Sequence, residues 1–439
     1  MRHAAHPESP RIPQPAWWHI VLAVYQIVLP ALLVLALPGW ILTMLRRGGR
    51  GTGLAERAGW YSTEIAYEPC GAVHVHAISV GEALLALQLM RKWRERDPQA
   101  RFVLAVGTAT GHAVASKATI PGLRVTYAPL DLPFMVAGYL RRFEPASIVL
   151  VEGEVWPNLL AQCGRRGILV SLVNARMSPR SERRYRKFSP LLRPLFSQLH
   201  VVAIQEDHHR AIWRQLGVPP AHIHLTGSLK FDPGAGDPPA RRREFAELLD
   251  HFGSGPVLLA ASTHDGEEAW LATAMREAAP HARLVIAPRH AERAGDAARD
   301  LLHAGFLAVR RSTWDGSLTS PPLPTVLLID TTGELRDWTA HASAVIIGKS
   351  FLSTGGQNPT EAILAHVPVI FGPHMENFEP LASQLTSSGA ALRTTHPADL
   401  AAAIRKALDP AQAARMTRAA HQCLLPHMGA ADRVISLLP

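Results

Sequence analysis

A glycine pair followed by a carboxylate is the first candidate for ligand binding in this sequence. Gly355-Gly356 follows an apolar run, Ala344–Ile347, and precedes Asn358 and Glu361 in the order G-G-Q-N-P-T-E. Glycine lets a backbone approach a ligand closely or adopt a positive φ. Glu361, in the first turn of the helix expected there, could accept hydrogen bonds from vicinal sugar hydroxyls, as an acidic residue does for ribose in dinucleotide folds. Alternatively, the glycines only turn the chain and the carboxylate only caps the helix.

A second carboxylate, Glu82, lies where a strand over Val73–Val80 is expected to give way to a helix over Ala83–Arg94. In open α/β sheets the ligand crevice lies at such strand ends. A carboxylate in this place could act as a general base that takes the proton from an attacking hydroxyl. The spacing alone favours a structural role, because the helix dipole stabilises Glu in a first turn.

Groups suited to anions follow two later strands. Ser262 and Thr263 lie where a strand ends and a helix begins, so hydroxyls and backbone N–H groups could hold a phosphate there. Arg289 follows the next strand, and its guanidinium could bind a phosphate or a carboxylate through two parallel hydrogen bonds.

A group of charged residues follows strands in the first half of the chain. Glu152 and Glu154 come directly after a predicted strand, where two nearby carboxylates would shift each other's pKa values. Together with Arg176, they could orient Glu82 or hold acceptor hydroxyls, and a purely structural Glu–Arg network is an equal alternative. Lys230 could reach a donor substrate or simply lie on the surface.

Two successive sets of apolar strands must position these residues. The expected strands are Val73–Val80, which alternates, and Phe102–Val106, Ile148–Val151, Leu169–Val173, Val201–Ile204, Val257–Ala260, Leu284–Ala287, Thr325–Ile329, Ala344–Ile347 and Val367–Phe371. Continuous apolar strands alternating with helices predict parallel sheets covered on both faces. We therefore expect an α/β fold with two Rossmann-like domains facing across a cleft, over residues 51–225 and 226–439, after a tail and anchor over residues 1–50.

Composition supports a folded protein with anionic partners. The 439 residues exceed one ordinary core, and 47% are hydrophobic against 18% charged. The 45 Lys and Arg against 36 Asp and Glu give a formal charge of +9, which suits an anionic substrate or membrane surface. Nucleic acid is not expected, because the basic residues form no stripe interleaved with aromatic residues. The exception is the basic run 176–187, which could be a solvated helix face or could meet anionic headgroups or lipid phosphates.

Several common sites are absent from the sequence. There is no G-x-G-x-x-G fingerprint and no phosphate-binding loop with a Gly-Lys-Ser/Thr ending, so neither a dinucleotide nor a nucleoside triphosphatase site is indicated. The three cysteines include no C-x-x-C, which argues against a disulfide framework or a thiolate zinc site. His74 and His76 face the same side of one strand, but no third metal ligand accompanies them, so hydrogen-bonded strand histidines are expected instead of a metal site.

The N-terminal segment predicts a membrane anchor. Residues 12–45 contain no Asp, Glu, Lys or Arg, and about 20 apolar residues suffice to span a bilayer. Trp17, Trp18 and Trp40 lie near its edges, where aromatic belts form, and Arg46, Arg47 and Arg50 follow, which places the C-terminal side in the cytoplasm. A cleaved signal peptide is the competing interpretation, although the segment is long for one. The sequence leaves open whether the anchor spans the membrane or lies in its interface.

Several short sequence motifs resemble, in the same order, those of the Kdo transferases. These are GT-B glycosyltransferases that add 3-deoxy-D-manno-octulosonic acid (Kdo) to lipid A precursors. The motifs are S-V-G-E at 79–82, Y-A-P-L-D-L-P at 127–133, E-G-E-V-W-P-N-L at 152–159, N-A-R-M-S at 174–178, G-S-L-K-F-D at 227–232, A-S-T-H-D-G-E-E at 261–268, P-R-H-A-E-R at 288–293, G-E-L at 333–335, and the G-G-Q-N-P-T-E loop with the V-P-V-I-F-G-P-H strand after it. The resemblance covers residues 51–389 approximately. Several independent motifs in one order indicate a family far more specifically than a single motif does.

The resemblance implies an inverting glycosyltransferase that moves Kdo from CMP-Kdo to a lipid A precursor in lipopolysaccharide biosynthesis. Glu82 matches the position of the family's catalytic base. Ser262, Thr263 and Arg289 would stabilise the phosphate, and Gly355, Gly356, Asn358 and Glu361 would hold the nucleotide. Glu152, Glu154, Arg176 and Lys230 would support the acceptor side. The implied enzyme needs no cofactor and no metal, consistent with the absence of an Asp-x-Asp pair, and works at the cytoplasmic face of the inner membrane.

The chain departs from the family at two positions of the glycine loop. Gln357 stands where His is usual, and Ala362 stands where Pro is common. An amide can donate a hydrogen bond as His can, but it carries no proton charge at neutral pH. Two alternatives therefore remain: a transferase or epimerase of the same fold that uses a UDP-sugar, and a non-catalytic membrane-bound protein that kept the fold.

Overall fold

The computed structural model describes residues 14–46, 53–61, 72–153, 155–232, 239–316 and 324–439. The chain divides into two compact units. The first unit comprises residues 1–234 together with the last thirteen residues, His427–Pro439, and the second comprises Ala235–Pro426. The chain therefore leaves the first unit once and returns to it at its C-terminal end.

Among the described residues, the first unit contains one parallel sheet of seven strands in the order β3-β2-β1-β4-β5-β6-β7. The strands are β1 (Val73–Ala77), β2 (Phe102–Val106), β3 (Leu123–Tyr127), β4 (Ser147–Val151), β5 (Leu169–Ala175), β6 (Val201–Ile204) and β7 (Ile223–Leu225). The helices are α1 (Ala16–Arg46), α2 (Leu54–Arg57), α3 (Val80–Arg96), α4 (Ala109–Ser116), α5 (Pro133–Phe143), α6 (Pro157–Arg166), α7 (Pro179–Lys187), α8 (Ser189–Phe196), α9 (Arg210–Gln215) and α18 (Ala430–Leu437).

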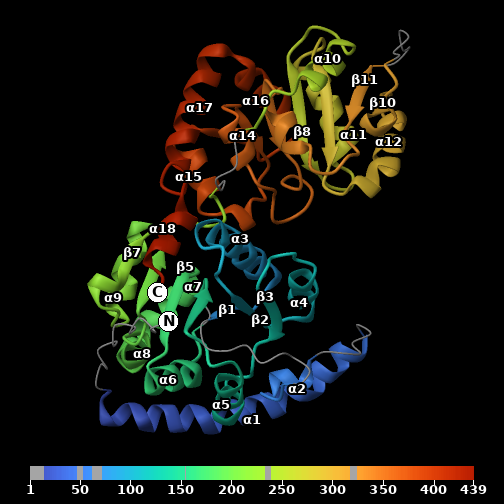
Figure 1. The fold of residues 1–439 in the computed structure, drawn as a ribbon. Helices are drawn as coiled ribbons and strands as arrows, with labels where there is room; N and C mark the ends of the chain where they lie inside the picture. Colours follow the sequence, from blue (N-terminus) through green and yellow to red (C-terminus); the bar gives the residue numbers. More distant parts are fainter. Residues whose placement is uncertain (1–13, 47–52, 62–71, 154, 233–238, 317–323) are drawn as a thin grey trace. The chain divides into compact units, whose positions relative to one another are not determined.

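Helices cover both faces of this sheet (Figure 1). On one face Val103 and Ala105 of β2 belong to a core with residues from α5, α6, α8 and α9, and on the other Phe102 and Leu104 belong to a core with α3, α4 and α18. Successive side chains of a strand point to opposite faces, so a strand buried on both sides is apolar at most positions. This explains why β2, β4, β5 and β6 were recognisable as apolar runs, whereas β1 carries the buried histidines His74 and His76.

The second unit repeats this architecture. In its described part the sheet is again parallel, with seven strands in the order β10-β11-β9-β8-β12-β13-β14. The strands are β8 (Val257–Thr263), β9 (Arg283–Pro288), β10 (Leu307–Arg310), β11 (Thr325–Leu328), β12 (Ala344–Ile347), β13 (Val369–Phe371) and β14 (Ala391–Arg393). The helices are α10 (Arg243–Asp250), α11 (Glu267–Ala278), α12 (Ala294–His303), α13 (Leu335–Thr339), α14 (Thr360–Leu364), α15 (Leu381–Ser387), α16 (Leu400–Leu408) and α17 (Pro410–Leu424).

The expected fold class is confirmed, since each unit is a Rossmann-like, doubly wound parallel sheet, and all ten expected strands are present. The sequence did not indicate β3, β7, β10 and β14, which lie at the edges of the two sheets. Edge strands are less buried: no residue of β10 is fully buried, and of β14 only Ala391 is. Their sequences therefore lack a continuous apolar signal.

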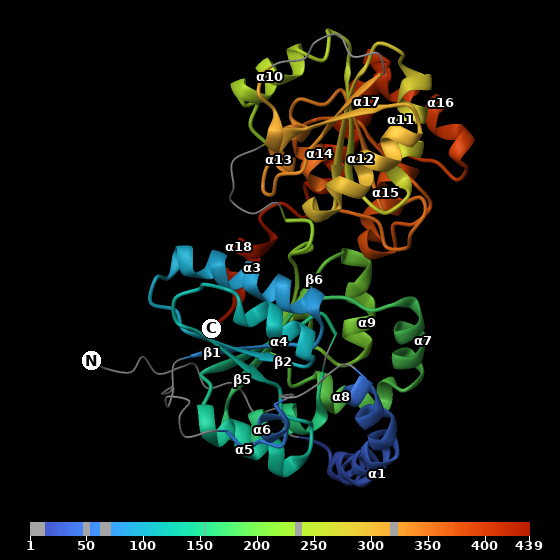
Figure 2. The ribbon, with the colours of Figure 1, turned by 90° about the vertical axis from the view of Figure 1, so that its right-hand side faces the viewer.

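The long N-terminal helix packs against the first unit. Trp18 and Leu22 of α1 are only 4% and 6% exposed and join the core formed by α5, α6 and α8. Trp18, which the sequence placed at a membrane edge, is therefore part of the protein interior. Figures 1 and 2 both show α1 lying along the side of the unit that carries α8 and α6.

Buried polar contacts fix the position of α1. The Tyr25 hydroxyl donates to Asp131 Oδ2 at 3.0 Å, and Gln26 Nε2 donates to Asn158 Oδ1 at 2.7 Å. Asp131 also accepts the backbone N–H groups of Asn158 and Leu159, the first turn of α6. Burial raises the pKa of Asp131 to about 6, and these three hydrogen bonds oppose that rise. The helix thus docks on the carboxylate that caps α6.

We expect Tyr25→Phe to lower the free energy of unfolding by about 2 kcal/mol at pH 8, because it removes a hydrogen bond to an ionised carboxylate. The Tyr25 hydrogen bond lowers the folded-state pKa of Asp131 and has no counterpart in the unfolded chain. Its contribution is therefore present above that pKa and is lost as pH falls through about 6. Urea unfolding of the detergent-solubilised protein at pH 8 and pH 5 measures both effects.

Tyr185→Phe is the matched control, because the Tyr185 hydroxyl makes no hydrogen bond within the described residues and its loss should change stability little. An equal effect of Tyr25→Phe at both pH values would show that the Asp131 charge does not contribute.

Candidate functional site

In each sheet, the point where the strand order reverses places two candidate loops next to each other. In the first unit β1 pairs with both β2 and β4, so the reversal lies between β1 and β4. Glu82 follows β1 and Glu152 follows β4 directly. Open α/β sheets bind ligands at such points, outside the carboxyl ends of the strands. The fold therefore brings these two carboxylates, far apart in sequence, to the same edge of the sheet.

The Glu82 carboxylate is buried, at 8% exposure, and locally held. Its Oε2 accepts the Ile78 N–H at 2.8 Å and its Oε1 accepts the Ser79 hydroxyl at 2.9 Å, while the Ser79 hydroxyl accepts the Glu82 N–H. Ser79 is the N-cap of α3, so the pair forms a reciprocal cap of the helix. The structural role expected from spacing is thus realised. A carboxylate has about four lone-pair directions, so two hydrogen bonds leave acceptor capacity for a substrate hydroxyl.

Glu152, Arg176 and Lys230 form a charged cluster with Glu82. Arg176 Nε donates to Glu152 Oε2 at 3.2 Å. Burial raises the pKa of Glu152, with the Glu82 charge adding to the rise, while Arg176 and Lys230 oppose it. Burial and the Arg176 charge lower the pKa of Lys230, against the influence of Glu152. The structure thus brings together the predicted acceptor-side residues, except Glu154, which lies outside the described residues.

The loop that carries Lys230 is held by a residue to which the sequence analysis assigned no role. Asn174, at the end of β5, is buried, and its Oδ1 accepts the Leu229 N–H at 3.0 Å and the Ser228 hydroxyl at 3.4 Å. At the far end of the same loop, Asp232 accepts the N–H groups of Gly429 and Ala431 at the start of α18. The sequence signal that could have identified Asn174 was its position in the N-A-R-M-S motif, directly after the predicted apolar strand.

In the second unit the reversal lies between β8 and β12. Gly348, which follows β12, donates its N–H to the Ala261 carbonyl and lies against the backbone of Thr263. A Cβ at Gly348 would lie 2.5 Å from the Thr263 Cα, so only glycine fits there. The loop after β12 and the loop after β8 are therefore packed backbone against backbone.

The three predicted anion-binding residues lie around this reversal point. Ser262 is in the left-handed region, with φ of 57°, and its neighbour Thr263 is fully buried, with its hydroxyl donating to Glu268 Oε1 at 2.9 Å. Arg289 donates its backbone N–H to the Thr263 carbonyl, and its side chain is exposed. The Thr263 hydroxyl thus already has a protein acceptor, and the Arg289 side chain extends into solvent beside the same strand ends.

The Gly355-Gly356 turn is buried against the segment after β13. The two residues have φ values of 107° and 65°, and a Cβ on Gly356 would lie 2.5 Å from the Met375 sulfur. The Gly355 N–H donates to Glu376 Oε2 at 2.6 Å, and the Gly355 carbonyl accepts the Asn377 N–H. Both glycines are thus required by the backbone conformation. Asn358 Oδ1 accepts the N–H of Thr360, the first residue of α14, across Pro359.

The charges of two arginines act on Glu361, and only one of these arginines was identified from the sequence. Burial raises the pKa of Glu361, while the positive charges of Arg336 and Arg289 oppose that rise. Arg336 is in the first turn of α13, which packs against α14, the helix that carries Glu361. Within the described part of the chain none of these three side chains has a hydrogen bond or an ion pair. Arg336 directly follows the G-E-L motif, and this position was the sequence signal that could have identified it.

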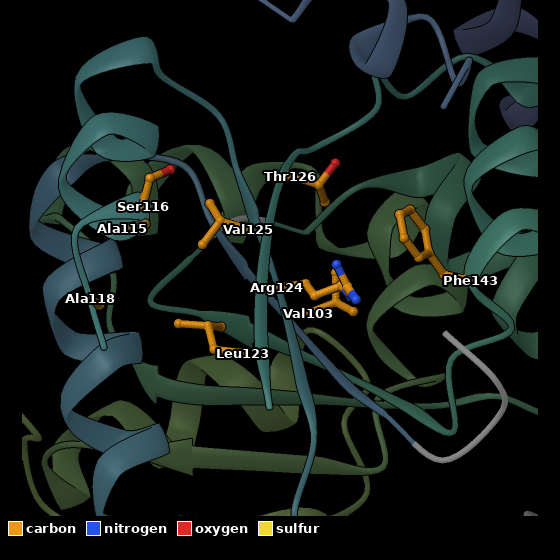
Figure 3. Close-up of a pocket in the computed structure, with 9 residues that line it drawn as sticks. All are labelled: Val103, Ala115, Ser116, Ala118, Leu123, Arg124, Val125, Thr126 and Phe143. Carbon is orange, nitrogen blue, oxygen red and sulfur yellow. The ribbon is translucent and has the colours of Figure 1, made fainter. Parts of the chain in front are cut away.

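A cavity of about 340 Å³ lies elsewhere in the first unit, at its β3 edge (Figure 3). Its lining residues are Val103, Ala115, Ser116, Ala118, Leu123, Arg124, Val125, Thr126 and Phe143. None of the predicted site residues lines it. The candidate site residues lie at the two points where the strand order reverses (the switch points), and not at this cavity.

His74 and His76 also contribute to the interior and not to the candidate site. His74 Nδ1 lies 2.6 Å and His76 Nε2 lies 3.2 Å from the Tyr139 hydroxyl, and both rings are buried. Burial lowers their pKa values to about 3 and about 4. The expectation of hydrogen-bonded strand histidines is confirmed.

Comparison with known proteins agrees with these features. Residues 52–233 match the family described as "3-Deoxy-D-manno-octulosonic-acid transferase (kdotransferase)". The chain is 31% identical to the 3-deoxy-D-manno-octulosonic acid transferase of Haemophilus influenzae, over 88% of this chain and 90% of that protein. It is 36% identical to the enzyme of the same name from Bordetella pertussis, over 83% and 86%. A crystal structure of a UDP-N-acetylglucosamine 2-epimerase has a TM-score of 0.51 at 12% identity, covering 84% of this chain and 95% of that one, which shows the shared fold alone.

Proposed function

The chain belongs to the family of 3-deoxy-D-manno-octulosonic acid (Kdo) transferases and is a glycosyltransferase; from that premise we propose that it transfers Kdo from CMP-Kdo to a lipid A precursor such as lipid IVA, with Glu82 as the general base. One observation carries the proposal. At the switch point of the first sheet, Glu82 and Glu152 converge with Arg176 and Lys230, so a carboxylate able to accept a proton lies among groups able to bind an anionic acceptor.

The proposed reaction is a single displacement with inversion. The acceptor hydroxyl oxygen forms a bond to the anomeric carbon of Kdo while the bond from that carbon to the phosphate oxygen breaks. CMP leaves with the bonding electrons, and the hydroxyl proton passes to the Glu82 carboxylate. The two hydrogen bonds from Ile78 and Ser79 fix the orientation of that carboxylate before the acceptor arrives.

Glu152 and Arg176 would act on the acceptor side without taking the proton. Their hydrogen bond, at 3.2 Å, places a positive charge next to a carboxylate whose pKa burial raises. Lys230, in the loop held by Asn174, adds a second positive charge with a lowered pKa. A phosphorylated acceptor would meet these cations, and Arg and Lys are the usual phosphate-binding side chains.

The donor would be held in the second unit. Within the described residues the Arg289 and Arg336 side chains form no ion pair, and both charges act on Glu361, so two guanidinium groups are available beside one carboxylate. CMP-Kdo carries two anionic groups, the phosphate and the sugar carboxylate, and guanidinium binds either of them in a bidentate manner. Glu361 would accept hydrogen bonds from ribose hydroxyls, and the Gly355-Gly356 turn would allow the backbone to approach the nucleotide.

The membrane contact would be made by α1 lying in the plane of the interface. By length and composition Ala16–Ala36, with a mean hydropathy of 2.3, could cross a membrane. One face of α1, however, is fixed to the first unit through Trp18, Leu22 and the Tyr25–Asp131 hydrogen bond. The opposite face exposes Ile20, Val24, Ile27, Val28, Leu32, Val34 and Leu35, and the adjoining α8 exposes Leu191 with Phe188 at its start.

The charge next to this apolar face supports an anionic membrane surface. Helix α7, PRSERRYRK, precedes α8 and carries four arginines and one lysine against one glutamate. Basic residues near an apolar face add attraction to anionic lipids. We therefore place the protein at the cytoplasmic face of the inner membrane, where the nucleotide-activated donor is available.

We expect Glu82→Gln to reduce kcat for Kdo transfer by about 10²–10⁴-fold, because the amide cannot accept a proton. The amide oxygen can still accept a local N–H, so α3 should remain capped and the KM for CMP-Kdo should change little. Transfer from freshly generated CMP-Kdo to tetraacyl lipid A precursor, in EDTA, measures this.

Glu82→Ala, which removes the cap as well, serves as the second variant, and thermal unfolding of both variants separates catalysis from stability. Equal transfer by wild type and both variants would show that Glu82 is not the base. Failure of the wild type to transfer Kdo, with turnover of a UDP-sugar, would favour the alternative donor.

We expect Arg289→Ala and Arg336→Ala each to raise the KM for CMP-Kdo by about ten- to a hundredfold, as the loss of a charge-assisted hydrogen bond predicts. Inhibition by CMP, which lacks the sugar carboxylate, tells the two contacts apart. The arginine whose loss raises KM but leaves the CMP inhibition constant unchanged is the one that binds the carboxylate.

Arg299→Ala is the control, since Arg299 pairs with Asp296 on the surface of α12 in the same unit and should change neither constant. A wild-type KM in both site variants would remove the two arginines from the donor site.

We expect an N-terminal tag on the full chain to be digested by protease added to inside-out inner-membrane vesicles. An in-plane α1 keeps both of its ends on the cytoplasmic side, which faces outward in these vesicles, whereas a spanning α1 carries the N-terminus into the lumen. A C-terminal tag, which is digested in either case, is the control. Protection of the N-terminal tag alone would show that α1 spans the membrane.

A further inference from the structure

Glu267, in the first turn of α11, is a fully buried carboxylate that binds two separate loops. Its Oε2 accepts the His264 N–H at 2.9 Å and the Lys349 N–H at 2.7 Å. Its Oε1 lies 3.3 Å from the Phe351 N and 3.4 Å from the Leu352 N, both of which donate to it. One side chain therefore takes four backbone hydrogen bonds, one from the loop after β8 and three from the loop after β12.

The charge of this carboxylate is compensated by backbone hydrogen bonds and not by an ion pair within the described residues. Among the described residues no Lys, Arg or His forms an ion pair with Glu267. Its neighbour Glu268 is equally buried but pairs with Arg293 at 3.0 Å and accepts the Thr263 hydroxyl. A buried charge is costly unless hydrogen bonds compensate it. The backbone N–H groups of residues 349–352 are that compensation, so the loop conformation and the Glu267 charge depend on each other.

The hydrogen bonds of Glu267 continue to the glycine turn. Lys349, with φ of 54°, is in the left-handed region, which disfavours any residue with a Cβ. Its N–H donates to Glu267, and its carbonyl accepts the Gly356 N–H at 3.1 Å. Gly355 in turn is held by Glu376. The arm 349–352 and the turn 355–356 are thus fastened at two ends by two carboxylates, of which only Glu267 is buried.

We propose that Glu267 is a positioning residue that holds the 349–352 arm, and through Lys349 the Gly355-Gly356 turn, in the conformation that binds the nucleotide of the donor. The proposal rests on the proposed function, which assigns this turn to the donor. Glu267 itself touches no substrate. Its effect depends on its charge and on both oxygens, because each oxygen serves a different pair of N–H groups.

The test is Glu267→Gln in the full-length protein, with Glu268→Gln as the matched control. Glutamine has the same size, but its NH₂ group would face one pair of N–H donors, so two of the four hydrogen bonds are lost. We expect backbone amide exchange at Lys349, Phe351, Leu352 and Gly356 to accelerate about ten- to a hundredfold. Glu268→Gln should leave exchange at these four amides unchanged, because its partners are Thr263 and Arg293.

Donor binding gives the second measurement. In Glu267→Gln we expect the Kd for CMP and the KM for CMP-Kdo to rise about tenfold while kcat stays within about threefold of the wild type, since the base is elsewhere. A merely structural role would instead lower thermal stability without this split between KM and kcat.

The outcomes separate the inference from the proposed function. The positioning role of Glu267 is overturned if amide exchange at residues 349–356 is unchanged in Glu267→Gln. It is also overturned if exchange accelerates equally in Glu267→Gln and Glu268→Gln. Accelerated exchange with an unchanged Kd for CMP shows that the loop does not position the nucleotide, and this too overturns the proposal. If the wild type does not transfer Kdo, the proposed function is wrong, whatever the amide-exchange rates show.

If Glu267→Gln does not fold, amide exchange in the wild-type protein tests the proposal instead. The Lys349 and Leu352 amides should then exchange as slowly as those of β12, although they lie in a loop. Rapid exchange at both would overturn the proposal.

Discussion

The structure depends on the burial of parallel strands on both faces. A strand in such a sheet has helices above and below it, so most of its side chains are apolar and its backbone groups are used by the ladder. Charged groups therefore collect mainly at the strand ends and in the loops that follow them. Every predicted site residue from Glu82 to Glu361 for which the structure gives a position lies at the carboxyl end of a strand, in the loop that follows it, or in the first turn of the next helix. The reversal of strand order decides which of these strand ends are neighbours.

Buried carboxylates hold those loops in place by accepting backbone N–H groups. Glu267 joins the loops after β8 and β12, Asp131 joins α6 to the N-terminal helix, and Asp232 joins the Lys230 loop to α18. A carboxylate can accept several hydrogen bonds at once, so a single side chain can replace the regular hydrogen bonding that a loop lacks. Lys349, whose backbone is in the left-handed region, is one of the loop residues held in this way. Within the described chain, four of the six non-glycine residues with positive φ, namely Glu152, Asn174, Ser262 and Lys349, lie at the carboxyl ends of strands.

The N-terminal helix shows how one segment can satisfy two environments. Its composition alone is that of a membrane span. Tyr25 and Gln26 are two of its few polar residues, and both make hydrogen bonds to the first unit. An isolated polar group in hydrocarbon would cost several kcal/mol, so these two residues favour a helix with one face on protein and the other on lipid. The basic helix α7 and the exposed Phe188 and Leu191 extend that surface.

The sequence by itself determined the fold class, most strands and the family, because fully buried strands and motif words are local signals that survive without coordinates. It also identified Glu82, Arg289 and Glu361 as residues at strand or helix ends. It did not assign roles to Asn174, Arg336 or Glu267, although each lies in or next to a family motif, because their roles come from contacts with residues that are distant in the sequence. Nor could it show that Ser79 and Ile78 hold the Glu82 carboxylate at the start of α3, a structural role that leaves the carboxylate able to accept a further hydrogen bond. Only the tertiary structure decided which loops meet, because strand order and helix packing, and not sequence distance, set the positions of charged groups relative to one another.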